Sequence, residues 1–202
     1  MKACPMNVAF LPLISYSFVN SITPGPNNIM LATSGVNYGF MRTLPHFCGV
    51  YFGFLFMLAI VSLGLGEIFT KVPEIQMAMK YAGSAYLLYL AYRITQAGQL
   101  SKVKVAKPLT FIEAALFQYI NPKAWVLAAT IPASFVSTPG VSQQDVIYLL
   151  MGHGLASFPS VLLWVIAGTQ LRRLLSSPKN LKIFNYTMAL LLVGTVAMIL
   201  TA

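Results

Sequence analysis

Two short polar motifs, each built around proline, interrupt stretches of sequence that are otherwise apolar. The first reads Ser21-Ile22-Thr23-Pro24-Gly25-Pro26-Asn27-Asn28 and the second reads Gln118-Tyr119-Ile120-Asn121-Pro122-Lys123. Their amide, hydroxyl and ammonium groups, together with the backbone groups that proline frees from helical pairing, offer donors and acceptors to a small polar molecule. In hydrocarbon such breaks persist only when they are buried in protein or line a wet cavity. We therefore interpret the two motifs as parts of one binding cavity.

The elements that carry these motifs are predicted to be membrane helices. The chain has 202 residues, of which 57% are hydrophobic and only 8% are charged, and its mean hydropathy is +0.74. A water-soluble domain needs more charge than this on its surface. Apolar runs of roughly 20 residues, the length that crosses a bilayer, recur at about 6–36, 44–66, 77–95, 109–136, 144–169 and 183–202. We expect a single all-α integral membrane domain over residues 1–202, with six transmembrane helices.

The two motifs occupy matching places in the two halves of the chain, because 122 − 24 = 98 and each lies near the start of three apolar segments. Repeat one is expected over about 6–96, a basic linker over about 97–108, and repeat two over about 109–202. Because each repeat crosses the membrane three times, an odd number, the second repeat enters the membrane from the side opposite to the first. The two repeats must therefore be inverted relative to each other. Proteins of this design bind substrate near the midplane, between broken helices. An ordinary proline kink explains either motif alone, but the symmetric placement favours a site, with helices one and four broken at their Pro motifs.

The net charge of +9 is distributed in a way that predicts topology rather than nucleic-acid binding. Nine of the thirteen Lys and Arg lie at the first, third and fifth connectors: Arg42, Arg93, Lys102, Lys104, Lys107, Arg172, Arg173, Lys179 and Lys182. Lys2, Lys71 and Lys80 lie at the other side. By the positive-inside rule the odd connectors are cytoplasmic and both termini are periplasmic. The basic linker also has the composition that attracts anionic lipid, but a solvated loop that obeys the positive-inside rule is the favoured interpretation.

Motifs spread over almost the whole chain resemble the LysE/RhtB family of amino-acid exporters. They are Thr23-Pro24-Gly25-Pro26-Asn27-Asn28-Ile29-Met30, Asn37-Tyr38-Gly39-Phe40, Gly49-Val50-Tyr51-Phe52-Gly53-Phe54, Ala82-Gly83-Ser84-Ala85-Tyr86-Leu87-Leu88-Tyr89-Leu90-Ala91 and Asn121-Pro122-Lys123-Ala124. The Pro-Gly-Pro-Asn-Asn version most resembles the branch that exports cysteine and O-acetylserine. The resemblance implies a six-helix protein of the bacterial inner membrane that expels amino acids using the proton-motive force.

Two departures from the family pattern affect the expected mechanism. Members often carry an Asp in the fifth helix, whereas this chain reads Ser157-Phe158-Pro159-Ser160-Val161 there. The usual Gly near the start of helix four is replaced by Ala114 or Ala115. A proton-coupling mechanism that uses an Asp at this place in the fifth helix therefore cannot operate in this chain, because that residue is absent.

An amino-acid substrate needs partners for its carboxylate and its ammonium. We expect the carboxylate to meet free N–H groups at the helix start near Pro26 to Asn28, assisted by Lys123. The ammonium is expected to meet carbonyls around Ser21 to Thr23 and Ile120, or the side-chain oxygens of Asn27 and Asn121. The predicted substrate-binding set is Thr23, Pro24, Gly25, Pro26, Asn27, Asn28, Asn121, Pro122 and Lys123. Lys123 snorkelling to an interface and Asn side chains capping their own helices are the competing interpretations.

Secondary candidates come from residues that are polar but less specifically placed. Asn20 and Gln118 either contact substrate or bridge helices. His46 and His153 are either proton carriers, since imidazole titrates near physiological pH, or buried histidines with satisfied hydrogen bonds. The four acids, Glu67, Glu74, Glu113 and Asp145, all lie near predicted span ends and are expected to be solvated.

The leading hypothesis is therefore a secondary exporter of small neutral amino acids or close derivatives, not an enzyme. A membrane thiol–disulfide electron carrier is an alternative, but Cys4 and Cys48 form no Cys-x-x-Cys and lie near neither break. A hydrolase would need a His-Glu-x-x-His or Gly-x-Ser-x-Gly signature, and no motif predicts a metal or other cofactor. An uncoupled channel or scaffold remains an alternative. Gly49-x-x-x-Gly53 in span two either packs internally or forms a homodimer.

Overall fold

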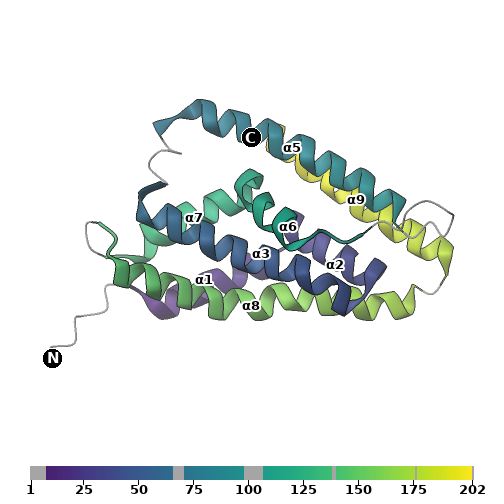
Figure 1. Ribbon diagram of the computed structural model, residues 1–202, viewed down its shortest axis with the longest axis horizontal. Helices are drawn as coiled ribbons and strands as arrows, with labels where there is room; N and C mark the ends of the chain where they lie inside the picture. The colour runs from purple at the N-terminus through teal and green to yellow at the C-terminus, as the bar shows by residue number, and fades with distance from the viewer. Residues whose placement is uncertain (1–7, 66–70, 98–106, 138–139, 176, 202) are drawn as a thin grey trace.

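The computed structural model of the chain describes residues 8–65, 71–97, 107–137, 140–175 and 177–201, and shows an elongated bundle of helices (Figure 1). The helices are α1 (Phe10–Ile22), α2 (Pro26–Tyr38), α3 (Phe40–Ile60), a π-helical turn η1 (Val61–Leu65), α5 (Pro73–Gln96), α6 (Phe111–Phe117), a 3-10 turn η2 (Gln118–Ile120), α7 (Pro122–Phe135), α8 (Gln143–Leu174) and α9 (Pro178–Thr201). Within these residues, β pairing is limited to an isolated bridge between Val8 and Val136. The predicted all-helical class is confirmed.

Both Pro motifs break a helix where the sequence predicted a break. α1 ends at Ile22 and α2 begins at Pro26, with extended backbone at Thr23 and Gly25 between them. α6 continues into η2, Asn121 takes an extended conformation, and α7 begins at Pro122. Proline at the first position of α2 and α7 fits, because that position has no intrahelical partner for an N–H. Each break is therefore followed directly by the N-terminus of a new helix.

The broken helices pack along unbroken ones through glycines. α1 and α2 lie along α8, α6 lies along α3, and α5 lies beside α9 (Figure 1). A Cβ atom on Gly49 would lie 2.3 Å from the Phe111 carbonyl oxygen, and one on Gly53 would lie 2.6 Å from Cα of Ala115. Gly49-x-x-x-Gly53 therefore packs within the chain against α6, and Ala115 is small enough to permit this approach.

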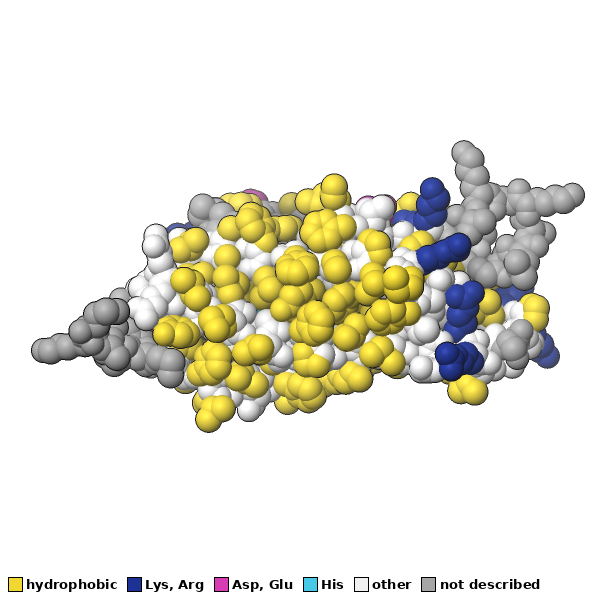
Figure 2. All heavy atoms as spheres, turned by 60° about the horizontal axis from the view of Figure 1, so that its bottom comes forward, with side chains coloured by type: hydrophobic (Ala, Val, Ile, Leu, Met, Phe, Trp, Pro, Cys, Tyr) yellow, Lys and Arg dark blue, Asp and Glu magenta, His cyan; other side chains and the backbone are white. Residues whose placement is uncertain are grey.

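On the face shown in Figure 2, hydrophobic side chains cover the middle of the bundle, and cations gather beyond one end of this apolar band. Large apolar side chains such as Leu11, Val126, Leu190 and Met198 are exposed, as expected of a surface that faces lipid. We call the end of the bundle where Lys and Arg gather the basic end. It lies at the helix termini on the right of Figure 1 and is defined by Arg42, Arg93, Lys107, Arg172, Arg173, Lys179 and Lys182. The odd connectors thus meet at one end wherever they are described.

Three of the described helical stretches are long and apolar enough to cross a membrane by length and composition, namely Phe40–Gly64, Gln143–Leu174 and Pro178–Thr201. The stretches Phe10–Ile22 and Phe111–Ile120 are apolar but shorter, since the breaks divide their spans. Among the predicted features, Lys2, Cys4, Glu67, Lys102 and Lys104 lie outside the described residues.

One of the four acids is buried, although the sequence predicted that it is solvated. Asp145 was expected to be solvated, but only 3% of it is exposed. Its carboxylate accepts hydrogen bonds from the backbone N–H and the hydroxyl of Ser142, at 3.0 and 2.6 Å, in a capping box at the start of α8. The expectation failed because Ser at the N-cap and an acid three residues later satisfy each other's groups and need no water.

Candidate functional site

The two breaks meet at one pocket in the interior of the bundle. It has an empty volume of about 560 Å³, part of which opens to the outside. Residues of the two motifs and the adjacent Asn20 line it: Asn20, Ser21, Gly25, Pro26, Asn27, Asn28, Gln118, Asn121 and Lys123. Side chains from α3, α7 and α8 complete the wall: Val50, Tyr51, Phe54, Ala124, Leu127, His153, Ser157 and Val161. We call this cavity the central pocket.

Two contacts join motifs that are far apart in the sequence. The amides of Asn27 and Gln118 hydrogen-bond reciprocally, with N···O distances of 2.9 and 3.3 Å across 91 residues. Nζ of Lys123 donates to the carbonyl of Thr23 at 3.1 Å, across 100 residues. Because Gln118 is fully buried, its amide depends on this pairing and on a bond to the Ala114 carbonyl. Gln118 therefore bridges the two broken helices, and it also lines the central pocket.

At the first break the freed carbonyls are satisfied from within the protein. Nδ2 of Asn28 donates to the carbonyls of Ser21 at 2.7 Å and Thr23 at 2.9 Å. Nε1 of Trp164 donates to the Ile22 carbonyl at 3.2 Å. The carbonyls expected to accept hydrogen bonds from the substrate ammonium thus already have protein donors.

The N-terminus of α2 is, by contrast, uncapped. Gly25 at the N-cap has no side chain to accept a hydrogen bond, and no described group accepts from the backbone N–H of Asn27 or Asn28. Both residues line the central pocket. Free N–H groups and the positive end of the helix dipole make this helix start a place for an anion.

The second break is capped differently. Oδ1 of Asn121 accepts a hydrogen bond from the backbone N–H of Lys123 at 3.2 Å, so this Asn caps α7. The Ile120 carbonyl packs against α5, where a Cβ on Gly83 would lie 2.1 Å from its oxygen. Ile120 is therefore directed at a neighbouring helix, and the expectation that its carbonyl faces the cavity is wrong.

Acceptors for a cation remain among the side chains of the pocket. The amide oxygens of Asn20 and Asn28 have no hydrogen-bond partner in the described part of the chain, because both amides use only their nitrogens. Oγ of Ser157 is buried and also lacks a partner there. Tyr51 and Phe54 add aromatic rings, whose faces attract cations.

Tyr51, Phe54 and Ser157 were not among the predicted site residues. The available signals were indirect. Tyr51 lies within Gly49-x-x-x-Gly53, whose glycines bring α3 close to α6. Ser157 lies in the stretch where the family resemblance led us to expect an Asp. Neither signal identifies the direction of a side chain, which depends on how α3 and α8 are rotated in the bundle.

The remaining predicted residues are distributed around the pocket or away from it. Thr23, Pro24 and Pro122 shape the breaks but do not line the cavity. His153 lines it, with Nδ1 3.1 Å from Oγ of Ser17 and its ring 4.6 Å from that of Phe54. His46 instead lines a second cavity nearer the basic end.

The pocket carries a positive charge that no acid balances. Among the described residues, the ion pair resolved is Arg93–Glu113, outside this pocket, and no carboxylate pairs with Lys123. In the same part of the chain no cluster of His, Cys, Asp and Glu is arranged to hold a metal ion. The arrangement can bind a small molecule with a negative group near Lys123 and the start of α2 and a positive group near the amide oxygens.

Comparisons with known proteins agree with this architecture. Residues 18–201 match the family model of the LysE type translocator. The cysteine/O-acetylserine efflux protein of Escherichia coli K12 is 28% identical over 184 residues, covering 89% of this chain and 91% of that protein. The protein of the same name from Shigella flexneri gives the same values. No solved structure matches. Because the family model spans nearly the whole sequence, the chain belongs to the LysE type translocators, a family of multi-pass membrane proteins.

Proposed function

We propose that the protein is a secondary exporter of small neutral amino acids or their close derivatives, of the cysteine and O-acetylserine type, in the bacterial inner membrane. The observation that carries the proposal is that Lys123 and the uncapped start of α2 line one pocket, together with acceptor oxygens of Asn20, Asn28 and Ser157 that have no partner among the described residues. The names of the efflux proteins that resemble this chain over most of its length support the substrate class.

The carboxylate of the substrate lies between Nζ of Lys123 and the N–H groups of Asn27 and Asn28. Lys123 donates to a neutral carbonyl, that of Thr23, and a carboxylate competes well for it because hydrogen bonds between charged partners are stronger. The ammonium lies against the amide oxygens of Asn20 and Asn28 and the hydroxyl of Ser157. A zwitterion leaves the pocket with only the charge of Lys123, whereas a cationic amino acid would add a second positive charge.

Alternating access follows from six spans arranged as two inverted repeats. Contacts support this arrangement in pairs: α1 and α2 pack on α8, and the corresponding α6 packs on α3. Each broken span thus packs on the middle span of the other repeat. Rocking of these two units about the central pocket would open it to one side at a time.

The basic end faces the cytoplasm in this proposal, by the positive-inside rule, and both termini are periplasmic. The proton-motive force drives export. The central pocket contains no carboxylate among the described residues, so His153 is the residue assigned to carry the proton, with Ser17 orienting its ring.

The decisive test is a comparison of metabolites in the medium of cells with and without the overexpressed chain, followed by flux of the identified compound in vesicles. We expect cysteine, O-acetylserine or a related neutral amino acid to accumulate in the medium of the overexpressing cells. An uncoupler should abolish this accumulation. Flux that persists without a proton gradient would favour a channel. No change in any amino acid would refute the exporter.

Two substitutions test the site itself. Lys123→Ala removes the pocket's cation, and Asn121→Ala removes the cap of α7. Hydrogen bonds to charged groups contribute about 1.5–3 kcal/mol, so Lys123→Ala should reduce flux at low substrate about 10- to 100-fold. Lys179→Ala, at an exposed position on α9, is the matched control and should have no effect. The site assignment is abandoned if Lys123→Ala and Asn121→Ala both leave efflux of every amino acid unchanged.

A further inference from the structure

A second polar cavity lies between the central pocket and the basic end. It has an empty volume of about 390 Å³ and follows α2 through Met30, Thr33, Ser34, Asn37 and Tyr38. The facing wall comes from α3, α5 and the segment before α6: His46, Leu90, Arg93, Ile94, Ala97, Lys107, Pro108 and Leu109. α2 continues directly from the uncapped start at Asn27 and Asn28. The same helix therefore lines both cavities in sequence.

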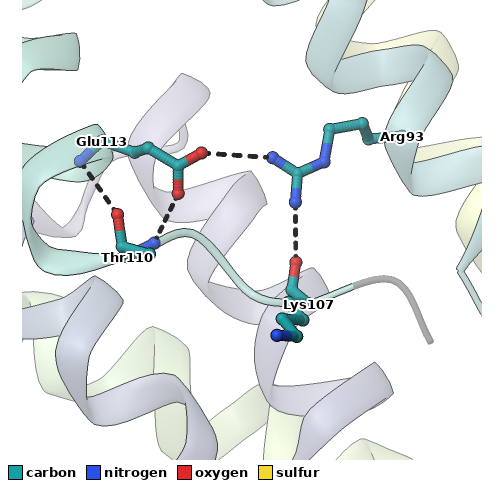
Figure 3. Close-up of polar contacts among 4 residues, drawn as sticks. All are labelled: Arg93, Lys107, Thr110 and Glu113. Carbon is teal, nitrogen blue, oxygen red and sulfur yellow. Dashed lines mark hydrogen bonds and ion pairs between the residues drawn. The ribbon is translucent and has the colours of Figure 1, made fainter. Parts of the chain in front are cut away.

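Two charged side chains, Arg93 and Lys107, line this wall, and Arg93 contacts one neutral carbonyl and one more distant carboxylate (Figure 3). It donates to the carbonyl of Lys107 at 2.8 Å, and its nearest contact with the Glu113 carboxylate is 3.7 Å. Glu113 is already engaged, because its other oxygen accepts from the backbone N–H of Thr110 at 2.7 Å in a capping box. Among the described residues, no carboxylate makes the bidentate contact that matches the geometry of the Arg93 guanidinium.

His46 supplies a second polar group without a partner. It is fully buried, and its Nε2 makes no hydrogen bond within the described residues. Nδ1 lies 3.1 Å from Oγ of Ser34, which has no other acceptor among those residues. If the hydroxyl donates to Nδ1, the ring proton is on Nε2, so a buried N–H donor is left unpaired. An unpaired buried donor is costly, and a bound acceptor would satisfy it.

At the opposite end of the bundle, the described residues at the start of α1 and at the end of α7 are in direct contact. The N–H of Ala9, just before α1, donates to the carbonyl of Phe135 at 3.0 Å, and the rings of Tyr16 and Phe135 are 5.3 Å apart. In an inverted repeat, the end of α2 and the start of α6 correspond to this closed contact. Asn37 and Tyr38 at the end of α2 are instead separated from Lys107 and Pro108 by the second cavity. Among the described residues, the two corresponding positions therefore differ, since a hydrogen bond joins one pair of segments and a cavity separates the other.

We propose that this second cavity is a vestibule that binds the carboxylate of the substrate, through Arg93 and His46, before the substrate passes along α2 to the central pocket. The proposal rests on the proposed export function and adds to it a separate binding site at the basic end. In the vestibule, the incoming carboxylate takes the place of the Lys107 carbonyl and of Glu113 as the partner of Arg93.

The test measures counterflow of radiolabelled O-acetylserine in inside-out and right-side-out vesicles, which separate the two faces. Arg93→Gln should raise the half-saturating concentration at the basic face at least tenfold and leave that at the opposite face unchanged. His46→Gln should change it in the same direction by a smaller factor.

Glu113→Gln is the discriminating variant. Gln also forms the capping box, so the start of α6 is preserved while the competing charge is removed. Freeing Arg93 from a partly exposed ion pair should lower the half-saturating concentration at the basic face about two- to fivefold. A purely structural role for the Arg93–Glu113 pair predicts that both variants weaken transport together. This second variant also decides the matter where Arg93→Gln does not fold.

Two outcomes separate this proposal from the export function. If the parent chain exchanges O-acetylserine but Arg93→Gln and Glu113→Gln leave half-saturation at the basic face unchanged, the vestibule is refuted and the exporter stands. If the parent chain exchanges neither O-acetylserine nor cysteine, the proposed substrate class fails, and the vestibule fails with it.

Discussion

The side chain of Lys123 occupies the space beside Gly25, so a substitution of Gly25 tests the position of the lysine. A Cβ atom on Gly25 would lie 3.1 Å from Cδ and 3.2 Å from Nζ of Lys123. The φ angle of Gly25 is −173°, an extended conformation that any residue adopts. The absence of a side chain at position 25 therefore makes room for the lysine rather than for an unusual backbone.

Gly25→Ala should displace the ammonium of Lys123 by a few tenths of an ångström without unfolding the chain, because the end of a lysine is flexible. The expected result is a several-fold rise in the half-saturating substrate concentration with unchanged protein yield. Gly194→Ala, where a Cβ atom meets nothing within 4 Å, is the control and should have no effect on transport. Unchanged transport in Gly25→Ala would mean that Lys123 does not contact the substrate.

Ser157 offers a second test at this scale, because its buried hydroxyl has no partner within the described chain. Ser157→Ala removes an unsatisfied polar group, so the unfolding temperature should stay the same or rise. Substrate binding should weaken about two- to tenfold if the hydroxyl accepts from the ammonium, as a hydrogen bond of about 0.5–1.5 kcal/mol implies.

Ser84→Ala is the matched control for that experiment. Its hydroxyl is likewise buried and unpaired, but it lies on α5, outside both cavities. Thermal stability should respond in the same direction, and transport should not respond at all. Equal effects of the two substitutions on substrate binding would exclude a direct role for Ser157.

Among the helices, the reciprocal amide pair of Asn27 and Gln118 couples the start of α2 to the end of α6. Either single substitution to Ala removes hydrogen bonds from the partner amide, and a polar atom left unsatisfied costs about 1–3 kcal/mol when it is buried. The double variant should be less destabilised than the sum of the two single variants. Unfolding temperatures of the purified chain in detergent provide the measurement.

A swap makes that coupling test sharper. Asn27→Gln combined with Gln118→Asn keeps the total side-chain length and should recover part of the lost stability, whereas each half of the swap alone should not. Thr187→Ala, at an exposed position on α9, should combine additively with Asn27→Ala. Additivity between positions 27 and 118 would show that the breaks do not support each other.

At the scale of the whole molecule, the separation of the apolar band from the basic end predicts a fixed orientation in the membrane (Figure 2). The gathered Lys and Arg should remain in the cytoplasm, which places the C-terminus on the periplasmic side. A C-terminal fusion to alkaline phosphatase should be active and a fusion to green fluorescent protein should be dark.

Moving the charges should weaken that orientation. Substituting Arg172, Arg173, Lys179 and Lys182 with Gln removes four cations from the basic end, and a fraction of fusions should then report the reverse orientation. A C-terminus that is cytoplasmic in the parent chain would contradict the assignment of the basic end and exchange the two faces in the vestibule experiment.

The sequence by itself determined the helical class, the two breaks and the concentration of cations at alternate connectors. These features depend on local chemistry: apolar length, the missing N–H of proline, and the cost of burying charge. For Asn121 and Gln118 the sequence left two roles open, and the structure shows Asn121 capping α7 and Gln118 bridging the two breaks while both line the pocket. The motifs alone were sufficient to indicate the family.

Only the tertiary structure decided which of the polar residues share a cavity. Tyr51 and Ser157 join the central pocket because glycine contacts fix how closely α3 packs on α6, and because α8 lies along both α1 and α2. His46 lies in the second cavity, and the Ile120 carbonyl is turned to α5. The physical reason is that periodicity identifies a helix, while the rotation and approach of one helix against another are set by side-chain packing over the whole bundle.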